Sequence, residues 1–79
     1  MVYESYKVRY QDLNLRVYRD GAGLDIEGLD DKALADIKLM DTGATHRLFC
    51  ILAGSSDLIK DLESAGAEVI GVEKAGILA

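Results

Sequence analysis

The side chains best suited to chemistry are Cys50, the single cysteine, which lies within an apolar segment, and His46, the single histidine, which precedes that segment. A reactive thiolate needs accessible, electropositive surroundings. The neighbours Leu48, Phe49 and Ile51 instead indicate a buried strand, so we interpret Cys50 as a core residue. His46 has no acidic or cysteine companion at a recognisable metal-binding spacing. We therefore predict no catalytic residue, no metal ligand and no cofactor, and we expect that the protein is not an enzyme.

A short polar turn, Gly54-Ser55-Ser56, lies where this apolar segment gives way to a helical pattern. Backbone N–H groups at such a junction can bind an anion, and serine hydroxyls would assist. The lysine and additional glycines of a phosphate-binding loop are missing. We favour a simple helix cap at Ser55 and Ser56, with anion binding at Gly54, Ser55 and Ser56 as the alternative.

Acidic residues are concentrated between positions 20 and 41 of a chain whose formal net charge is −5. Only Lys32 and Lys38 oppose them within that stretch. Carboxylates spaced on a small rigid body can occupy a basic groove that is built for nucleic acid. The residues of this predicted acidic partner-binding face are Asp20, Asp25, Glu27, Asp30, Asp31, Asp36 and Asp41.

A second candidate face lies near the N-terminus, where all four tyrosines fall within the first eighteen residues, among lysine and arginine. Aromatic and basic side chains on strands are typical of single-stranded nucleic acid surfaces and of protein interfaces. The negative net charge opposes a phosphate backbone, so direct nucleic acid binding is our third hypothesis. The residues of this alternative partner-binding face are Tyr6, Lys7, Arg9, Tyr10, Arg16 and Tyr18.

Hydrophobic periodicity predicts the elements that position these residues. The shift of alternation near residues 11–14 indicates either a tight turn between two strands or one long strand with a β-bulge, and we favour two strands between residues 3 and 19. Turn residues 20–23 lead to a short third strand at 24–28. Asp30 is expected to cap a first helix that ends at Gly43. The apolar run 47–53 predicts a fourth strand, residues 55–65 a helix that stops at Gly66, and residues 67–72 a last strand.

These elements predict an α/β fold of the α+β type, with the order β-β-β-α-β-α-β. We expect residues 1–79 to form a single compact domain, a two-layer sandwich of a mixed four- or five-stranded sheet and two helices. Strand 47–53 should be central and parallel to the last strand, through a right-handed crossover. The predicted core residues are Leu34, Ile37, Leu48, Phe49, Ile51, Leu52, Leu58 and Leu62.

The functional expectation follows from what the composition excludes. One cysteine excludes an intramolecular disulfide framework, no signal peptide is recognisable at Met1, and no apolar run approaches the roughly 18 residues of a membrane span. We expect a cytoplasmic protein without a membrane partner. In size and charge the chain resembles small phage-encoded inhibitors such as anti-CRISPR proteins and DNA mimics.

We therefore predict a small acidic, non-enzymatic inhibitor or regulator. As a monomer or homodimer it would bind a larger protein, such as a basic nucleic-acid-handling complex, and block it. The alternative is a regulatory domain that senses a small molecule at the turn 54–56 or at a dimer interface.

Overall fold

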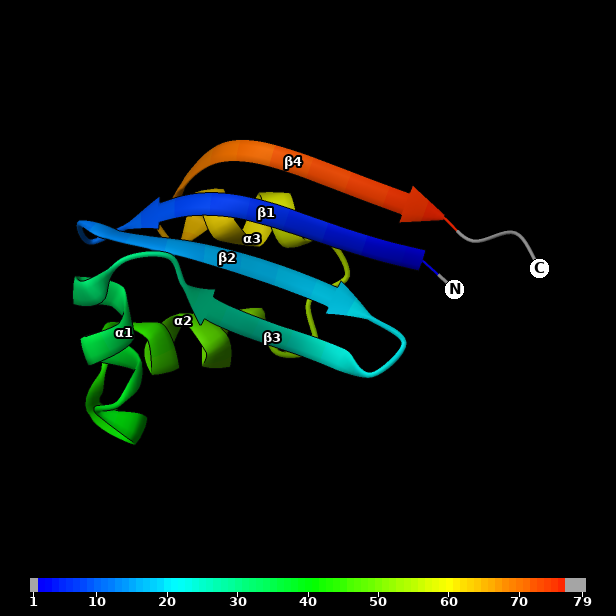
Figure 1. Cartoon of the computed structure of the whole chain (residues 1–79). Helices are drawn as coiled ribbons and strands as arrows, with labels where there is room; N and C mark the ends of the chain where they lie inside the picture. The colour runs from blue at the N-terminus through cyan, green and yellow to red at the C-terminus, as the bar shows by residue number, and fades with distance from the viewer. Residues whose placement is uncertain (1, 77–79) are drawn as a thin grey trace.

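The computed structural model describes residues 2–76 of the chain as a small α+β domain with one four-stranded antiparallel sheet (Figure 1). The strands are β1 (Val2–Tyr10), β2 (Leu13–Asp20), β3 (Gly23–Gly28) and β4 (Glu68–Gly76), in the spatial order β3-β2-β1-β4. Each strand is antiparallel to its neighbour. In this order β4, the last of the described strands, lies beside β1, the first.

Two tight turns connect the first three strands, as the sequence predicts. Gln11 and Asp12 join β1 to β2 with φ angles of 49° and 64°, the left-handed conformations that two-residue hairpins favour. Gly21 and Ala22 join β2 to β3, and Asp20 Oδ1 accepts a hydrogen bond from the Ala22 N–H at 2.7 Å. The two separate N-terminal strands and the short third strand are therefore confirmed.

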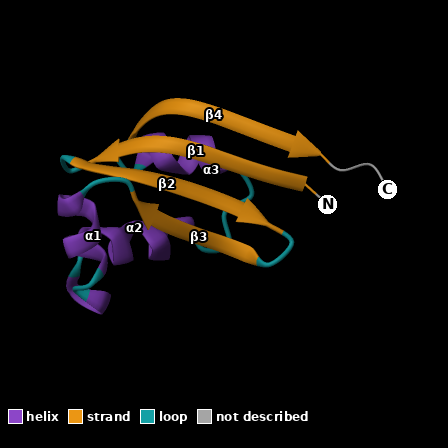
Figure 2. Cartoon of the chain, viewed as in Figure 1, coloured by secondary structure: helices purple, strands orange, loops and turns teal. Residues whose placement is uncertain are grey.

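The helices are drawn in purple in Figure 2, and the second and third α-helices form a layer on one face of the sheet. They are α1 (Asp31–Ile37), the 3-10 turn η1 (Met40–Thr42), α2 (Ala44–Leu52) and α3 (Leu58–Ser64). Figure 1 shows α2 and α3 behind the sheet and α1 near the end of β3. No helix in the described part of the chain combines the length and apolarity that crossing a membrane requires.

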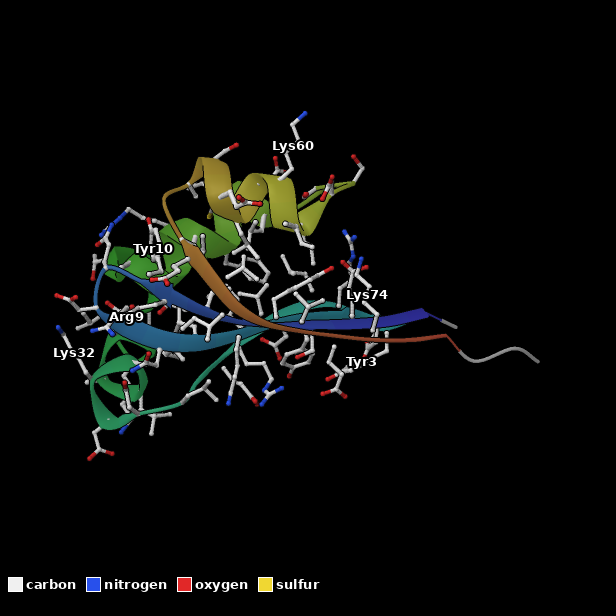
Figure 3. All side chains as sticks on the ribbon, turned by 90° about the horizontal axis from the view of Figure 1, so that it is seen from above. Tyr3, Arg9, Tyr10, Lys32, Lys60 and Lys74 are labelled. Atoms are coloured by element: carbon white, nitrogen blue, oxygen red, sulfur yellow. The ribbon has the colours of Figure 1, made fainter. Side chains whose placement is uncertain are left out.

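The core lies between the sheet and the helices. Alternate residues of β1 and β2 point toward the helices and are buried, and Figure 3 shows Tyr10 on this side and Tyr3 on the open side. Leu48 and Leu52 of α2 and Leu58 and Leu62 of α3 are each at most 1% exposed, which confirms four predicted core residues. The strand residues of the core are Tyr6, Val8, Tyr10, Leu13, Leu15, Val17 and Ile26.

The largest error of the sequence prediction concerns residues 47–53, which belong to helix α2 rather than to a central strand. The mixed sheet and the parallel crossover were consequently wrong, and there are three α-helices in place of two. Phe49 and Ile51 are 38% and 49% exposed, and Cys50 is exposed as well. Burial of these three residues was therefore wrong.

Helix geometry explains this outcome. The buried residues Ala44, Leu48 and Leu52 recur at four-residue intervals, so one side of α2 faces the core while its other apolar residues face outward. A short apolar run is compatible with a buried strand or with a helix, and periodicity within the run alone does not separate them. Leu34 of α1 is also 47% exposed, contrary to prediction, and Ile37 is only partly buried.

Two helix boundaries also differ from the prediction. Gly43 begins α2 as its N-cap instead of ending α1, and a Cβ there would lie 2.5 Å from the Asp36 carbonyl oxygen, so glycine is required for this close approach. Asp57, not the serines, caps α3 by accepting the Lys60 N–H at 3.2 Å. Gly66 follows α3 with φ 89°, as predicted.

Candidate protein-binding surface

Helix α2 carries apolar residues on both of its sides. The side toward the sheet is formed by buried residues, including Leu48 and Leu52, whereas Phe49, Cys50 and Ile51 lie on the outward side. A helix of a soluble domain normally turns a polar face to water, and a helix that is apolar all round is normally covered all round. His46 and Arg47 of α2 are exposed as well, so its outward side combines apolar and polar side chains, as contact surfaces commonly do.

A groove of about 350 Å³ runs along this outward side, between α2, the α1–η1 segment and β3. We call it the α2 groove. Its apolar lining comes from Ile26, Ile37, Met40 and Phe49, and its polar lining from Asp25, Asp41, Thr45 and His46. The apolar floor with carboxylates beside it suits a ligand that carries both apolar and positively charged groups.

Met40 is the most exposed large apolar side chain of this surface, at 71%. Its φ of 55° lies in the left-handed region, which an unbranched non-glycine residue adopts at a cost of about 1–3 kcal/mol. The structure thus places a flexible apolar side chain in solvent on a constrained backbone. Methionine at such a position adapts readily to the shape of a binding partner.

Asp36, a member of the predicted acidic face, accepts hydrogen bonds from the start of α2. Its Oδ1 accepts the Ala44 N–H at 3.0 Å and its Oδ2 accepts the Thr45 N–H at 2.7 Å. Burial raises the pKa of the Asp36 carboxyl, but contacts with the Thr45 side chain and with these N–H groups outweigh it, so the pKa lies below its usual value. Asp36 therefore links α1 to α2.

Asp30 has a similar role at the start of α1. Its Oδ1 accepts the Ala33 N–H at 2.8 Å, which confirms the predicted cap, and its Oδ2 accepts a hydrogen bond from Asn14 Nδ2 at 2.5 Å. The hydrogen bond from Ala33, followed by that from Asn14, lowers the pKa of Asp30. Asp30 and Asp36 hold helix ends, so their carboxylates are only partly available to a partner.

The acidic residues of β3 pair with β2 on the open face of the sheet. Asp25 Oδ2 accepts a hydrogen bond from the Tyr18 hydroxyl at 3.1 Å, and Glu27 Oε1 lies 3.0 Å from Arg16 Nε. The hydrogen bond to Asp25 raises the pKa of Tyr18. Both faces proposed from the sequence therefore meet here, because Arg16 and Tyr18 of the alternative face touch the acids of the other.

The remaining acids of the predicted face are spread over the surface. Asp31 and Asp41 are exposed, in the first turns of α1 and η1, and Asp20 lies at the β2–β3 turn. Of the seven, Asp25 and Asp41 lie together beside the α2 groove. The Asp25 carboxylate is bonded to Tyr18 on the open face of the sheet and to the Ile26 N–H, so Asp41 is the acid of the predicted face that offers its carboxylate at the groove.

The predicted tyrosine and arginine face divides between the two sides of the sheet. Tyr6 and Tyr10 are 1% and 6% exposed and belong to the core. The Tyr6 hydroxyl donates to Glu4 Oε1 at 3.0 Å, and burial, assisted by this bond, raises the pKa of Tyr6 to about 12. Lys7 and Arg9 are exposed on the open side, so this set does not form one surface.

Within the turn 54–56, Ser55 makes hydrogen bonds to other parts of the chain. The Ser55 hydroxyl accepts the Asp57 N–H at 3.2 Å, and the Ser55 carbonyl accepts a hydrogen bond from the Arg19 guanidinium. The Asp57 carboxylate lies at the start of α3, where it places negative charge at the position that an anion would take. These contacts do not favour the anion site, and the cap of α3 is Asp57 rather than the predicted Ser55 and Ser56.

His46 and Cys50, which appear unrelated in an extended strand, become neighbours on the helix. Cys50 Sγ lies 3.5 Å from His46 Nε2 on the exposed side of α2. In the described part of the chain, no group of three or more histidine, cysteine or acidic side chains is placed to hold a metal ion. The signal that the sequence analysis missed is the four-residue spacing of this pair, which is meaningful only on a helix.

Comparisons with protein-family models, with curated proteins and with solved structures found no match.

Proposed function

We propose that this chain is a small, non-enzymatic protein-binding inhibitor or regulator that binds a basic partner at the α2 groove. The supporting observation is the apolar lining of the α2 groove, where the exposed side chains of Phe49 and Met40 lie beside Asp41. Contiguous exposed apolar surface on a small soluble domain is typical of an interaction site. The partner would insert an apolar side chain between Phe49 and Met40 and place lysine or arginine near the Asp41 carboxylate.

Charge supports the choice of a basic occupant. The chain has a net charge of −5, which accelerates association with a positively charged surface. Nucleic-acid-handling proteins present such surfaces, and inhibition by occupation of that surface fits the phage-inhibitor profile described above. We propose a cytoplasmic location as well, because a small domain with a single cysteine has no disulfide framework of the kind that secreted domains use.

The alternative of a small-molecule sensor has weaker support. One of its two expected ligand positions, the turn 54–56, has internal hydrogen bonds at Ser55, and the other is a dimer interface, for which no observation speaks. Binding of nucleic acid on the open sheet face is also less well supported, because Asp25 and Glu27 lie beside Tyr18 and Arg16 there.

Quantitative capture from extract of the cells that produce the chain tests the proposal. The variant Phe49→Ser removes the aromatic contact, and Asp41→Asn removes a groove charge that is not a helix cap. We expect Phe49→Ser to weaken capture of a basic protein at least about tenfold, since aromatic anchors dominate interfaces. We expect Asp41→Asn to slow association most at low salt, where exposed charges are least screened.

The matched control replaces charges on the opposite side of the molecule. Lys7→Gln combined with Arg9→Gln alters two exposed residues of β1 that do not line the α2 groove. This double variant should capture the same partner as the unchanged chain. If it loses the partner while Phe49→Ser retains it, the open sheet face is the binding surface and the proposal is wrong. Circular dichroism of each variant controls for folding.

A further inference from the structure

The paired side chains of His46 and Cys50 are a second feature of α2, and the inference drawn from them does not rest on the proposed function, although His46 also lines the α2 groove. Sγ of Cys50 and Nε2 of His46 are 3.5 Å apart, and both residues are exposed. No other hydrogen bond in the described part of the chain engages either side chain. The two atoms are therefore free to bind a third group together.

The separation of these atoms matches that of two ligands on one zinc ion. Zinc–sulfur and zinc–nitrogen bonds of about 2.3 Å and 2.0–2.1 Å, at a tetrahedral angle of about 109°, place sulfur and nitrogen about 3.5–3.6 Å apart. The pair already has this spacing, so little rearrangement of side chains is needed. A helix allows Cys50 and His46 to approach each other in this way because residues four apart are adjacent on its surface, whereas on a strand they are about 13 Å apart.

One chain supplies only half of such a site. Structural zinc takes four protein ligands, and the described residues contain no group of three or more candidate ligands. A second copy of this chain would supply the same pair across a two-fold axis. The resulting set of two thiolates and two neutral imidazoles balances the double positive charge of the ion, so it is compatible with an apolar interface.

The residues around His46 and Cys50 favour a second copy of this chain as the source of the other two ligands. Phe49 lies next to Cys50 on the outward side of α2, where it would pack against the partner copy when two α2 helices meet. Arg47, the basic residue of α2, directs its Nη1 to the Thr42 carbonyl at 3.1 Å, which holds its charge at the start of the helix. We infer that two copies of this chain bind one zinc-type divalent ion through His46 and Cys50 of each.

Titration with Zn²⁺ and Co²⁺ tests the inference, in a buffer with a non-thiol reductant that prevents an intermolecular disulfide. We expect sedimentation to show a dimer with one ion per two chains, and Co²⁺ to give the charge-transfer and ligand-field absorption of tetrahedral thiolate coordination. EDTA should return the chain to monomers. His46→Ala and Cys50→Ser should each weaken metal binding at least about tenfold, a loss that even an outer-shell partner of a zinc ligand can cause.

Three results would overturn the inference. One is a chain that stays monomeric with Zn²⁺ and shows no thiolate absorption with Co²⁺. Another is binding of one ion per chain without dimerisation, which would show that a second copy is not needed. The third is metal-dependent dimerisation that survives in Cys50→Ser, which would show that sulfur is not a ligand. Circular dichroism of both variants separates loss of ligands from loss of folding.

Discussion

Replacing Leu48 with alanine is expected to lower the free energy of unfolding by about 2–5 kcal/mol, the usual range for a fully buried leucine. The Leu48 side chain is 0% exposed and lies in the cluster that joins α2 to the sheet. A domain of this size has only a few kcal/mol of stability. Urea denaturation should therefore show a large fraction of Leu48→Ala molecules unfolded in buffer.

Phe49→Ala is the matched control, because it removes a larger apolar side chain from the adjacent position. Phe49 is 38% exposed, so this change should lower the free energy of unfolding by less than about 1 kcal/mol. A buried strand at residues 47–53 would predict the opposite, with a loss of about 3–5 kcal/mol for the aromatic residue. Equal or larger destabilisation by Phe49→Ala would contradict the orientation of α2.

Asp36→Ala should lower the free energy of unfolding by about 1–3 kcal/mol, because helix caps and hydrogen bonds to charged groups have this range. The change leaves the N–H groups of Ala44 and Thr45, both buried residues, without the carboxylate that accepts them. Asp41→Asn serves as control, because Asp41 is exposed and its substitution should change stability by less than about 0.5 kcal/mol.

The pH dependence of Asp36→Asn gives a second measure of the same contact. The pKa of Asp36 is lowered on folding, so its stabilising contribution is present above its unfolded pKa of about 3.9 and is lost as pH falls through the folded value. The difference in unfolding free energy between the unchanged chain and Asp36→Asn should be constant from about pH 5 to 7 and shrink below about pH 4. A difference that does not shrink in acid would show that the ionised carboxylate is not responsible.

The first three strands could be predicted from sequence because their signals are local. The even-numbered residues of β1 and the odd-numbered residues of β2 alternate with polar ones, and the shift between them indicates a turn or a bulge, of which the structure has the turn at Gln11 and Asp12. Asp30 likewise precedes its helix at the position where a cap is expected. Each of these features depends on residues within one turn or one hairpin.

The segment 47–53 could not be assigned in this way, because its apolar residues lie on both sides of a helix. The informative pattern includes Ala44, which precedes the run, and recurs at Leu48 and Leu52. Within the run only Ile51 is β-branched, which also favours a helix. The strand interpretation placed Phe49 and Ile51 in the core, so the α2 groove, at which we propose partner binding, could not be recognised from the sequence.

The acidic face was only partly predictable for a related reason. Sequence shows where carboxylates are abundant but not which of them accept backbone hydrogen bonds. Asp36 lies eight residues before Ala44 in sequence, and only the fold of the α1–α2 connection brings its carboxylate to that N–H. The groove beside Asp25 and Asp41 depends in the same way on contacts between β3, η1 and α2.

The measurement that tests the central claim most directly is photo-crosslinking from the outward side of α2. Cys50 is the single cysteine of the chain and is exposed next to Phe49, so a benzophenone maleimide can be attached there without mutation. The matched probe is carried by Lys7→Cys in a Cys50→Ser background, on the exposed open side of the sheet. EDTA in both reactions removes metal ions that could bridge two copies.

If the α2 groove binds a basic partner, illumination in extract will join that partner to the probe at Cys50 and not to the probe at position 7. Excess unlabelled chain should suppress the cross-link, and excess unlabelled Phe49→Ser should suppress it much less. Cross-linking of a partner from position 7 alone would contradict the account, because it would place the binding surface on the open face of the sheet.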